Sequence, residues 1–187
     1  YLEHSVPTGS WRFLNQLWGG FSLPGFFGEV TAALSNTSMF THEVAPVATL
    51  IEKELITALG GLVGFKEPDG LFVTGGSNAN MVAMMAARFR HFPEMTREGS
   101  TGARLQIFVS DQSHYSFNKA ANLMGLGLNN VIKVASDSAG RMRPDALDAA
   151  IRLSKEQGAK PFFVGATAGT TVLGAFDPLQ AIGEICD

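Results

Sequence analysis

From residue 71 onward, the sequence alternates short apolar runs with longer helical patterns. The apolar runs are rich in β-branched and aromatic residues and lie at 71–73, 105–109, 131–134 and 162–166. The helical patterns between them lie at 78–90, 115–124 and 144–154. This alternation indicates βαβ units, and therefore an α/β fold with a mostly parallel sheet flanked by helices. Pro144 and Pro178 stand at expected first helical positions, and we expect Asp177 to cap the last helix.

The first 40 residues differ from the rest because they show no clean period and are rich in Gly, Phe and Trp. A helical pattern follows from about Val44 to Leu59, with Gly60 and Gly61 as its expected stop. We therefore expect residues 1–62 to form an N-terminal arm and helix that pack on a larger domain, of which residues 63–187 form the N-terminal part.

Charge and cysteine content exclude several classes of partner. The net charge of −3 gives no electrostatic reason to expect nucleic acid or an anionic membrane surface. No apolar run approaches the roughly 18 residues that a membrane span needs. A single cysteine favours a reducing compartment, so we expect a cytoplasmic protein. The histidines at 4, 42 and 91 lack metal-ligand spacing, and no metal is expected.

The strongest local motif is the glycine-rich segment Thr74-Gly-Gly-Ser-Asn-Ala-Asn80, which leads from an apolar run into a helical pattern. Such a turn lets the backbone approach a ligand closely, and the first free N–H groups of a helix favour an anion. Ser77 is a candidate both for capping the helix and for donating its hydroxyl to a phosphate. The motif differs from the phosphate loop of NTPases and from dinucleotide-binding glycine motifs. The alternative is an ordinary turn capped by serine.

Two further polar segments follow apolar runs. His114 lies in Ser110-Asp-Gln-Ser-His-Tyr-Ser116, where an imidazole would be placed to stack on an aromatic cofactor or to move a proton. Thr170 and Thr171 lie in a second, Gly/Thr-rich loop, where either hydroxyl is a candidate for binding a polar cofactor group. Taken singly, each segment is also compatible with an ordinary loop. Loops that follow successive parallel strands converge at one edge of a sheet, which favours a common site.

These segments carry a resemblance to a known family. With Arg12-Phe-Leu-Asn-Gln-Leu17, Asn36-Thr-Ser-Met-Phe-Thr-His-Glu-Val-Ala-Pro46 and Gly174-Ala-Phe-Asp-Pro178, they form an ordered set that runs nearly end to end. The sequence resembles the group II pyridoxal-phosphate (PLP) dependent amino-acid decarboxylases. This resemblance implies fold type I, the aspartate aminotransferase-like fold of PLP-dependent transferases, in a homodimer. The chain would be a fragment of the large, PLP-binding domain.

The resemblance also implies roles for individual residues. Gly76 and Ser77 would hold the PLP phosphate, and His114 would stack on the pyridine ring and handle protons. Thr171 falls at a cofactor-contacting position, and Gln16 falls in the substrate pocket of the glutamate and cysteine-sulfinate branch. The implied reaction is the decarboxylation of an acidic L-amino acid, namely glutamate, cysteine sulfinate or aspartate.

Two departures from the family pattern affect this interpretation. Gly9-Ser-Trp-Arg-Phe13 stands where relatives often have Gly-His-Pro-Arg-Phe. By the family pattern, the aspartate that pairs with the pyridine nitrogen and the lysine that binds PLP covalently both lie beyond residue 187. Lys119 is not expected to replace that lysine. We therefore expect an internal piece of a longer protein, inactive alone, or one of two chains that complete the site. The alternative is a truncated, non-catalytic relative that binds or regulates a full-length decarboxylase. A nucleotide-binding module would require glycine motifs that are absent.

Overall fold

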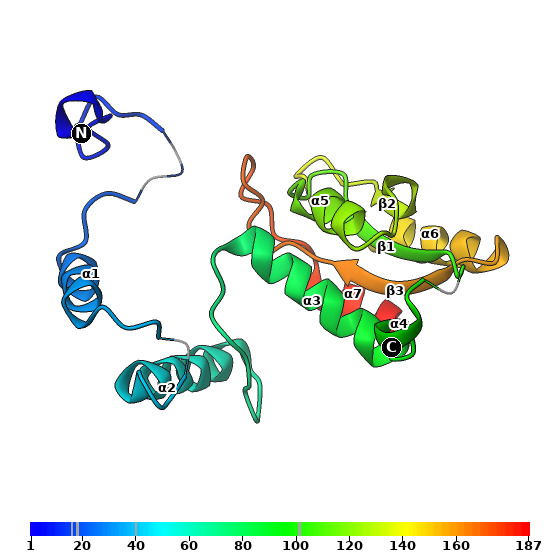
Figure 1. Ribbon diagram of the computed structural model, residues 1–187. Coiled ribbons are helices and arrows are strands. Elements are labelled where there is room, and N and C mark those ends of the chain that lie inside the picture. Colours follow the sequence, from blue (N-terminus) through cyan, green and yellow to red (C-terminus); the bar gives the residue numbers. More distant parts are fainter. Residues whose placement is uncertain (16, 18, 40, 101) are drawn as a thin grey trace. The chain divides into compact units, whose positions relative to one another are not determined.

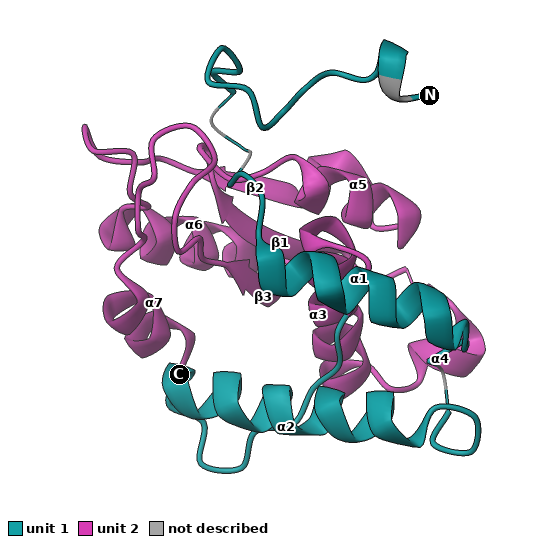
Figure 2. Ribbon diagram, turned by 90° about the vertical axis from the view of Figure 1, so that its left-hand side faces the viewer, with its two compact units in different colours: residues 1–72 teal, residues 73–187 magenta. Residues whose placement is uncertain are grey.

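The computed structural model describes residues 1–15, 17, 19–39, 41–100 and 102–187. The chain forms two compact units, residues 1–72 and residues 73–187 (Figure 2). The domain division that the sequence places between residues 62 and 63 stays a prediction. No helix in the described ranges combines the length and the low polarity that crossing a bilayer requires.

The first unit contains a short 3-10 turn, η1 (Leu2–His4), and two helices, α1 (Leu23–Ser35) and α2 (Pro46–Val63). Sequence analysis missed α1, although its boundaries follow ordinary rules. Ser22 caps the N-terminus, where its Oγ accepts the Gly25 N–H at 3.3 Å, and Asn36 ends the helix in the left-handed conformation with φ 45°. The many large apolar residues of α1 conceal its helical period.

Helix α2 confirms the expected helix, but it does not stop at Gly60 and Gly61. It continues through both glycines and ends at Gly64, whose φ of 102° suits a residue without a side chain. Gly60 is needed at its place in the helix, because a Cβ there would lie 2.2 Å from the Cβ of Pro68. Gly60, which was expected to stop the helix, is therefore explained by its close packing against Pro68.

The strand expected at residues 71–73 is wrong. These residues form no strand in the structure, and Leu71 and Phe72 are exposed. The Phe72 N–H is bound by a side chain, because it donates to Oε1 of Glu52 on α2 at 2.8 Å. An apolar run becomes a strand only where a neighbouring backbone pairs with it.

The second unit is built on a parallel sheet of three strands, β1 (Leu105–Ser110), β2 (Val131–Val134) and β3 (Lys160–Gly165). Their order across the sheet is β2-β1-β3, so β1 is central, and all six of its residues are buried. The three strands confirm the apolar runs at 105–109, 131–134 and 162–166. The helices are α3 (Gly76–His91), α4 (Met95–Glu98), α5 (Ser116–Leu123), α6 (Pro144–Glu156) and α7 (Leu179–Cys186), with a 3-10 turn, η2 (Leu128–Asn130), before β2 (Figure 1).

Alternating residues of β1 serve two separate cores. Ile107 and Val109 face a cluster that contains Met84 of α3 and Phe117 of α5. Phe108 faces the opposite cluster, which contains residues of α6 and α7. The second unit therefore has three layers, with α3 and α5 on one face of the sheet and α6 and α7 on the other.

Gln106, on the face of β1 toward α6, is a buried polar residue that is 4% exposed. Its Oε1 accepts the Ser154 hydroxyl of α6 at 2.5 Å, and its Nε2 donates to Oδ1 of Asn130 at 3.4 Å. Both ends of the amide are therefore bound, as burial of a polar group requires.

The two expected proline starts have different outcomes. Pro144 is the first residue of α6, as predicted. Helix α7 begins at Leu179, with Pro178 as its N-cap, so Asp177 is not the cap. Asp177 is instead buried, and its carboxylate accepts backbone N–H groups from two other segments.

Candidate functional site

The strand order reverses at the central strand β1, because successive connections run to opposite sides of it. From β1 the chain passes through α5 to β2 on one side, and from β2 it returns through α6 to β3 on the other side of β1. The segment after β1 leads to α5 on one face, and the segment after β3 leads to α7 on the opposite face. Open α/β sheets bind ligands outside the carboxyl ends of the strands at such a point. His114 follows β1 and Thr171 follows β3, so the topology places both at this edge.

A cleft of about 400 Å³ lies at the N-terminus of α3, against α5. It is lined by Thr74, Gly75, Gly76, Ser77, Asn78, Met81, Ser116, Lys119, Ala120 and Leu123. The hydrogen bonds of α3 start with Asn78 and Ala79, whose N–H groups both donate to the Gly75 carbonyl at 3.0 Å. The N–H groups of Gly76 and Ser77 precede this ladder, which leaves them for a ligand.

Glycine is required at the start of this helix. Gly75 is the N-cap with φ 142° and ψ 171°, a conformation that side chains rarely permit. In the described part of the chain, no atom beyond the chain neighbours and the helix's own backbone lies within 4 Å of the place where a Cβ on Gly75 or Gly76 would stand. Because Gly75 caps the helix without a side-chain hydrogen bond, Ser77 does not cap it, and that part of the prediction is wrong. The Ser77 side chain is exposed and lines the cleft.

Ser116 connects the cleft to His114. Its hydroxyl accepts Nδ2 of Asn80 from α3 at 2.8 Å, and its backbone N–H donates to Nδ1 of His114 at 3.2 Å. With Nδ1 accepting, Nε2 is the imidazole nitrogen that carries the proton. One side of the half-buried imidazole lies against Tyr115, with ring centroids 4.2 Å apart. The sequence motif included Ser116, but its connecting role depends on a contact with α3 that the motif does not reveal.

Polar contacts with β2 and the turn after it hold the segment that carries His114. The Ser136 hydroxyl and backbone N–H both donate to Asp111, and these contacts, led by the hydroxyl, hold the pKa of the Asp111 carboxyl below its ordinary value. Lys133 Nζ donates to the Ser113 hydroxyl at 3.1 Å. Burial lowers the pKa of Lys133, and the negative charge of Asp111 acts in the opposite direction. The His114 segment is therefore held through Asp111 and Ser113, which lie three residues and one residue before His114.

Thr171 lies near the tip of a hairpin that follows β3. Ala168 and Phe176 form an antiparallel bridge, and Thr170 closes the loop because its Oγ1 accepts the Ala175 N–H at 3.0 Å. Thr170 is buried and bound within the loop, whereas Thr171 is exposed. Of the two threonines that the sequence proposed, Thr171 is therefore the one accessible to a ligand.

The structure thus brings Gly76 and Ser77 together in one cleft and connects His114 to it through Ser116. Thr171 lies at the same edge of the sheet but is not among the residues that line this cleft. Gln16, predicted in the substrate pocket, lies outside the described residues. Lys119 lines the cleft, and its Nζ lies 4.4 Å from the centroid of the Tyr115 ring. In the described part of the chain, no group of three or more His, Cys, Asp or Glu residues is arranged to hold a metal ion.

Comparison with known proteins identifies the family. The model of the pyridoxal-dependent decarboxylase conserved domain matches residues 1–187. The chain belongs to this family of decarboxylases. PLP is the family's cofactor, and the predicted fold type I is confirmed by the solved structures of PLP decarboxylases that the chain resembles.

The chain is similar to decarboxylases that are named for different substrates. It is 44% identical to mouse cysteine sulfinic acid decarboxylase, over 99% of this chain and 38% of the relative. The crystal structure of mouse CSAD matches the chain with a TM-score of 0.94, over 97% of this chain and 39% of that one. The chain is 43% identical to mouse acidic amino acid decarboxylase GADL1, over 100% of this chain and 34% of the relative. Catharanthus roseus tryptophan decarboxylase is 26% identical, with a TM-score of 0.78 over 88% of this chain and 37% of that one. The chain therefore spans about two fifths of the length of the decarboxylases that it matches.

The cleft at α3 has the properties that the phosphate of the family's cofactor requires. Gly76 and Ser77, whose N–H groups precede the hydrogen-bond ladder of this 16-residue helix, line the cleft, as do the hydroxyl-bearing residues Thr74 and Ser77. A phosphate takes hydrogen bonds from both kinds of donor, and the helix dipole favours its negative charge.

Proposed function

We propose that this chain forms part of the cofactor domain of a carbon–carbon lyase that decarboxylates an acidic L-amino acid with PLP. The observation that carries the proposal is the difference in identity between two groups of relatives. The chain is 43–44% identical to decarboxylases of cysteine sulfinic acid and acidic amino acids, but only 26% identical to a tryptophan decarboxylase.

Four residues of this chain have distinct tasks in the proposed site. The backbone N–H groups of Gly76 and Ser77, with the Ser77 hydroxyl, bind the phosphate and fix the cofactor's position. His114 presents the face of its imidazole that lies away from Tyr115 to the pyridine ring. Its Nε2 holds the proton for the reaction, because Nδ1 is occupied by the Ser116 N–H. Thr171 donates its hydroxyl to a polar group of the cofactor.

Bound PLP supplies the electron sink that decarboxylation of an amino acid requires. By the family pattern, the lysine that binds PLP and the aspartate that pairs with the pyridine nitrogen belong to sequence outside these 187 residues. Residues 1–187 alone are therefore expected not to release carbon dioxide from an amino acid.

The substrate class is tested by measuring carbon dioxide release by the complete gene product. The substrates are glutamate, cysteine sulfinate, aspartate and an aromatic amino acid, each with added PLP. Turnover of one or more of the acidic substrates is expected. Turnover of the aromatic substrate alone would contradict the proposal.

The attachment site is tested by borohydride reduction of the PLP-loaded gene product, followed by mass spectrometry. The pyridoxyl-lysine is expected in a peptide outside residues 1–187. An adduct on Lys119, which lines the cleft, would overturn the assignment of the cleft to the phosphate and give Lys119 the covalent role.

We further propose that the protein acts as a homodimer, or together with a second chain that carries the rest of the domain, in the cytoplasm. Light scattering coupled to size-exclusion chromatography measures the assembly. A monomer that contains bound PLP and is fully active would contradict the dimer.

A further inference from the structure

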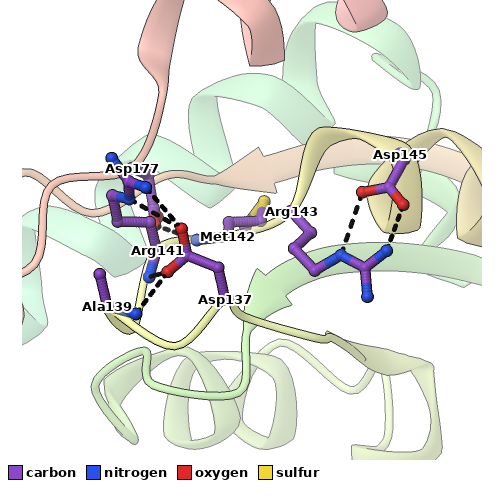
Figure 3. A network of polar contacts seen from close by, with 7 residues as sticks. All are labelled: Asp137, Ala139, Arg141, Met142, Arg143, Asp145 and Asp177. Carbon is purple, nitrogen blue, oxygen red and sulfur yellow. Dashed lines mark hydrogen bonds and ion pairs between the residues drawn. The ribbon is translucent and has the colours of Figure 1, made fainter.

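Asp177 is a buried carboxylate whose two oxygens bind two separate segments. It is 4% exposed, Oδ1 accepts the Met142 N–H at 2.7 Å, and Oδ2 accepts the Thr167 N–H at 2.7 Å (Figure 3 shows the contact with Met142). Its own backbone N–H donates to the Thr167 carbonyl at 2.9 Å. Hydrogen bonds to a carboxylate are shorter and stronger than those to neutral acceptors, so this residue holds both segments firmly.

The Thr167 contact closes the base of the hairpin that carries Thr171. Thr167 and Asp177 stand at the two ends of this hairpin, residues 167–177. Further inside, the Gly169 and Thr170 N–H groups both donate to the Ala175 carbonyl, at 3.0 and 2.9 Å. Every residue between the base and the tip is therefore in a fixed register, and the position of Thr171 follows from the position of the base.

The Met142 contact attaches this hairpin to the body of the unit. Met142 is 1% exposed and belongs to the core cluster between the sheet and α6 and α7. A second contact lies near the tip, because a Cβ on Gly140 would stand 2.5 Å from Cδ1 of Leu173. The turn at residues 136–142 thus touches the hairpin near both ends.

We propose that Asp177 is a positioning residue that sets the place of Thr171 for the cofactor without touching the cofactor itself. This inference rests on the proposed function, because it assumes that Thr171 contacts PLP. The carboxylate is buried and has both oxygens occupied by backbone donors, so it acts only through the hairpin.

The experiment measures the dissociation constant for PLP in the complete gene product and four of its variants. Asp177→Asn keeps the size of the side chain but places an amide NH₂ against a backbone donor, so one of the two contacts is lost. Asp137→Asn is the matched control. Asp137 lies in the turn at residues 136–142, which also contains Met142. Its carboxylate accepts the Ala139 and Arg141 N–H groups of this turn, each at 2.9 Å, and not a backbone donor of the hairpin (Figure 3). Thr171→Ala, alone and combined with Asp177→Asn, completes a double-mutant cycle.

We expect Asp177→Asn to raise the PLP dissociation constant about tenfold, as the loss of one charge-assisted hydrogen bond predicts. The control should stay within about twofold of wild type. In the cycle, the double variant should bind PLP no more weakly than the weaker single variant, because both changes remove the same contact. Additive effects, an unchanged dissociation constant, or an equal loss in the control would each overturn the positioning role.

A second measurement needs neither a folded variant nor bound cofactor. In the cofactor-free wild-type protein, the amides of Thr167 and Met142 should exchange hydrogen about as slowly as those of β1. Exchange at the rate of an open loop would overturn the inference even if Asp177→Asn fails to fold. Failure of wild-type protein to bind PLP would refute the proposed function instead, and the exchange rates would still show whether Asp177 fixes the hairpin.

Discussion

The most direct test of the packing concerns Gly165, the last residue of β3. A Cβ at this position would stand 2.8 Å from Cζ and 2.9 Å from Cε1 of Phe117, and 3.0 Å from Cγ1 of Val109. Carbon atoms pack best at about 3.5–4.0 Å, so at least half an ångström of movement would be needed. Phe117 and Val109 are 6% and 0% exposed and belong to the same core cluster, so neither can move into solvent.

We therefore expect Gly165→Ala to lower the free energy of unfolding by about 1–3 kcal/mol, the usual cost of an extra carbon in a close-packed core. The measurement is urea unfolding of the complete gene product, followed by circular dichroism. Gly183→Ala is the matched control. Gly183 lies within α7, and among the described residues no atom outside its chain neighbours and the helix's own backbone lies within 4 Å of its Cβ position. The Gly183→Ala variant should therefore gain about 0.5–1 kcal/mol of unfolding free energy from the better helix former.

Phe117→Leu provides the decisive comparison. By itself it removes ring atoms from the core and destabilises the protein, but with Gly165→Ala it also removes the two nearest of the three atoms that the new methyl group would meet. The combined loss should therefore be smaller than the sum of the single losses. If Gly165→Ala changes stability by less than about 0.5 kcal/mol, or if the two losses simply add, this account of the core is wrong.

Three further predictions follow from contacts of the second unit. Ser154→Ala leaves Oε1 of Gln106 buried without its donor and should cost about 1–3 kcal/mol of unfolding free energy; adding Gln106→Leu should recover part of this loss in the same urea assay. Ser136→Ala removes the main cause of the lowered Asp111 pKa, so NMR titration should show that pKa rising toward its ordinary value of 3.8. Because the folded pKa of Asp111 lies below that value, the stability that Asp111 contributes is fully present above pH 3.8 and is lost as the pH falls through the folded pKa. Above pH 3.8, Ser136→Ala should therefore lack most of this contribution to the free energy of unfolding. His114→Phe keeps an aromatic ring but no titratable proton, so PLP affinity should change little while kcat falls by about 10²–10⁴. His114→Asn can still accept the Ser116 N–H but has no ring, so both PLP affinity and kcat should fall. Equal losses of PLP affinity in the two variants would argue against stacking.

The sequence predicted the second unit well because its elements are specified locally. Each buried strand is a compact run of β-branched and aromatic residues, and the Pro144 start of α6 depends only on the fixed φ of proline. The same local chemistry identified the glycine-rich start of α3, where Gly75 must adopt a positive φ.

The errors arose where distant parts of the chain decide the outcome. Residues 71–73 have the composition of a strand, but the Phe72 N–H is bound by Glu52, 20 residues earlier. Asp177 has the sequence context of a helix cap, but Met142 lies 35 residues away and occupies one of its oxygens. Ser77 directly precedes the helical pattern expected from residue 78, but the helix starts two residues earlier, at Gly76, with Gly75 as its N-cap. Ser116 became visible as a link only through Asn80, which reaches it from 36 residues away.

The closed hairpin at residues 167–177 has a consequence for how this loop can vary in length. Its base is joined by the reciprocal contacts of Thr167 and Asp177, and its interior by those of Thr170 and Ala175. An inserted or deleted residue between these pairs would shift one side of the hairpin against the other and break the register of both. Only residues 171–173 lie beyond the innermost pair, in which the Gly174 N–H donates to the Thr170 carbonyl at 2.9 Å, so single-residue insertions that keep the protein folded should be confined to this tip.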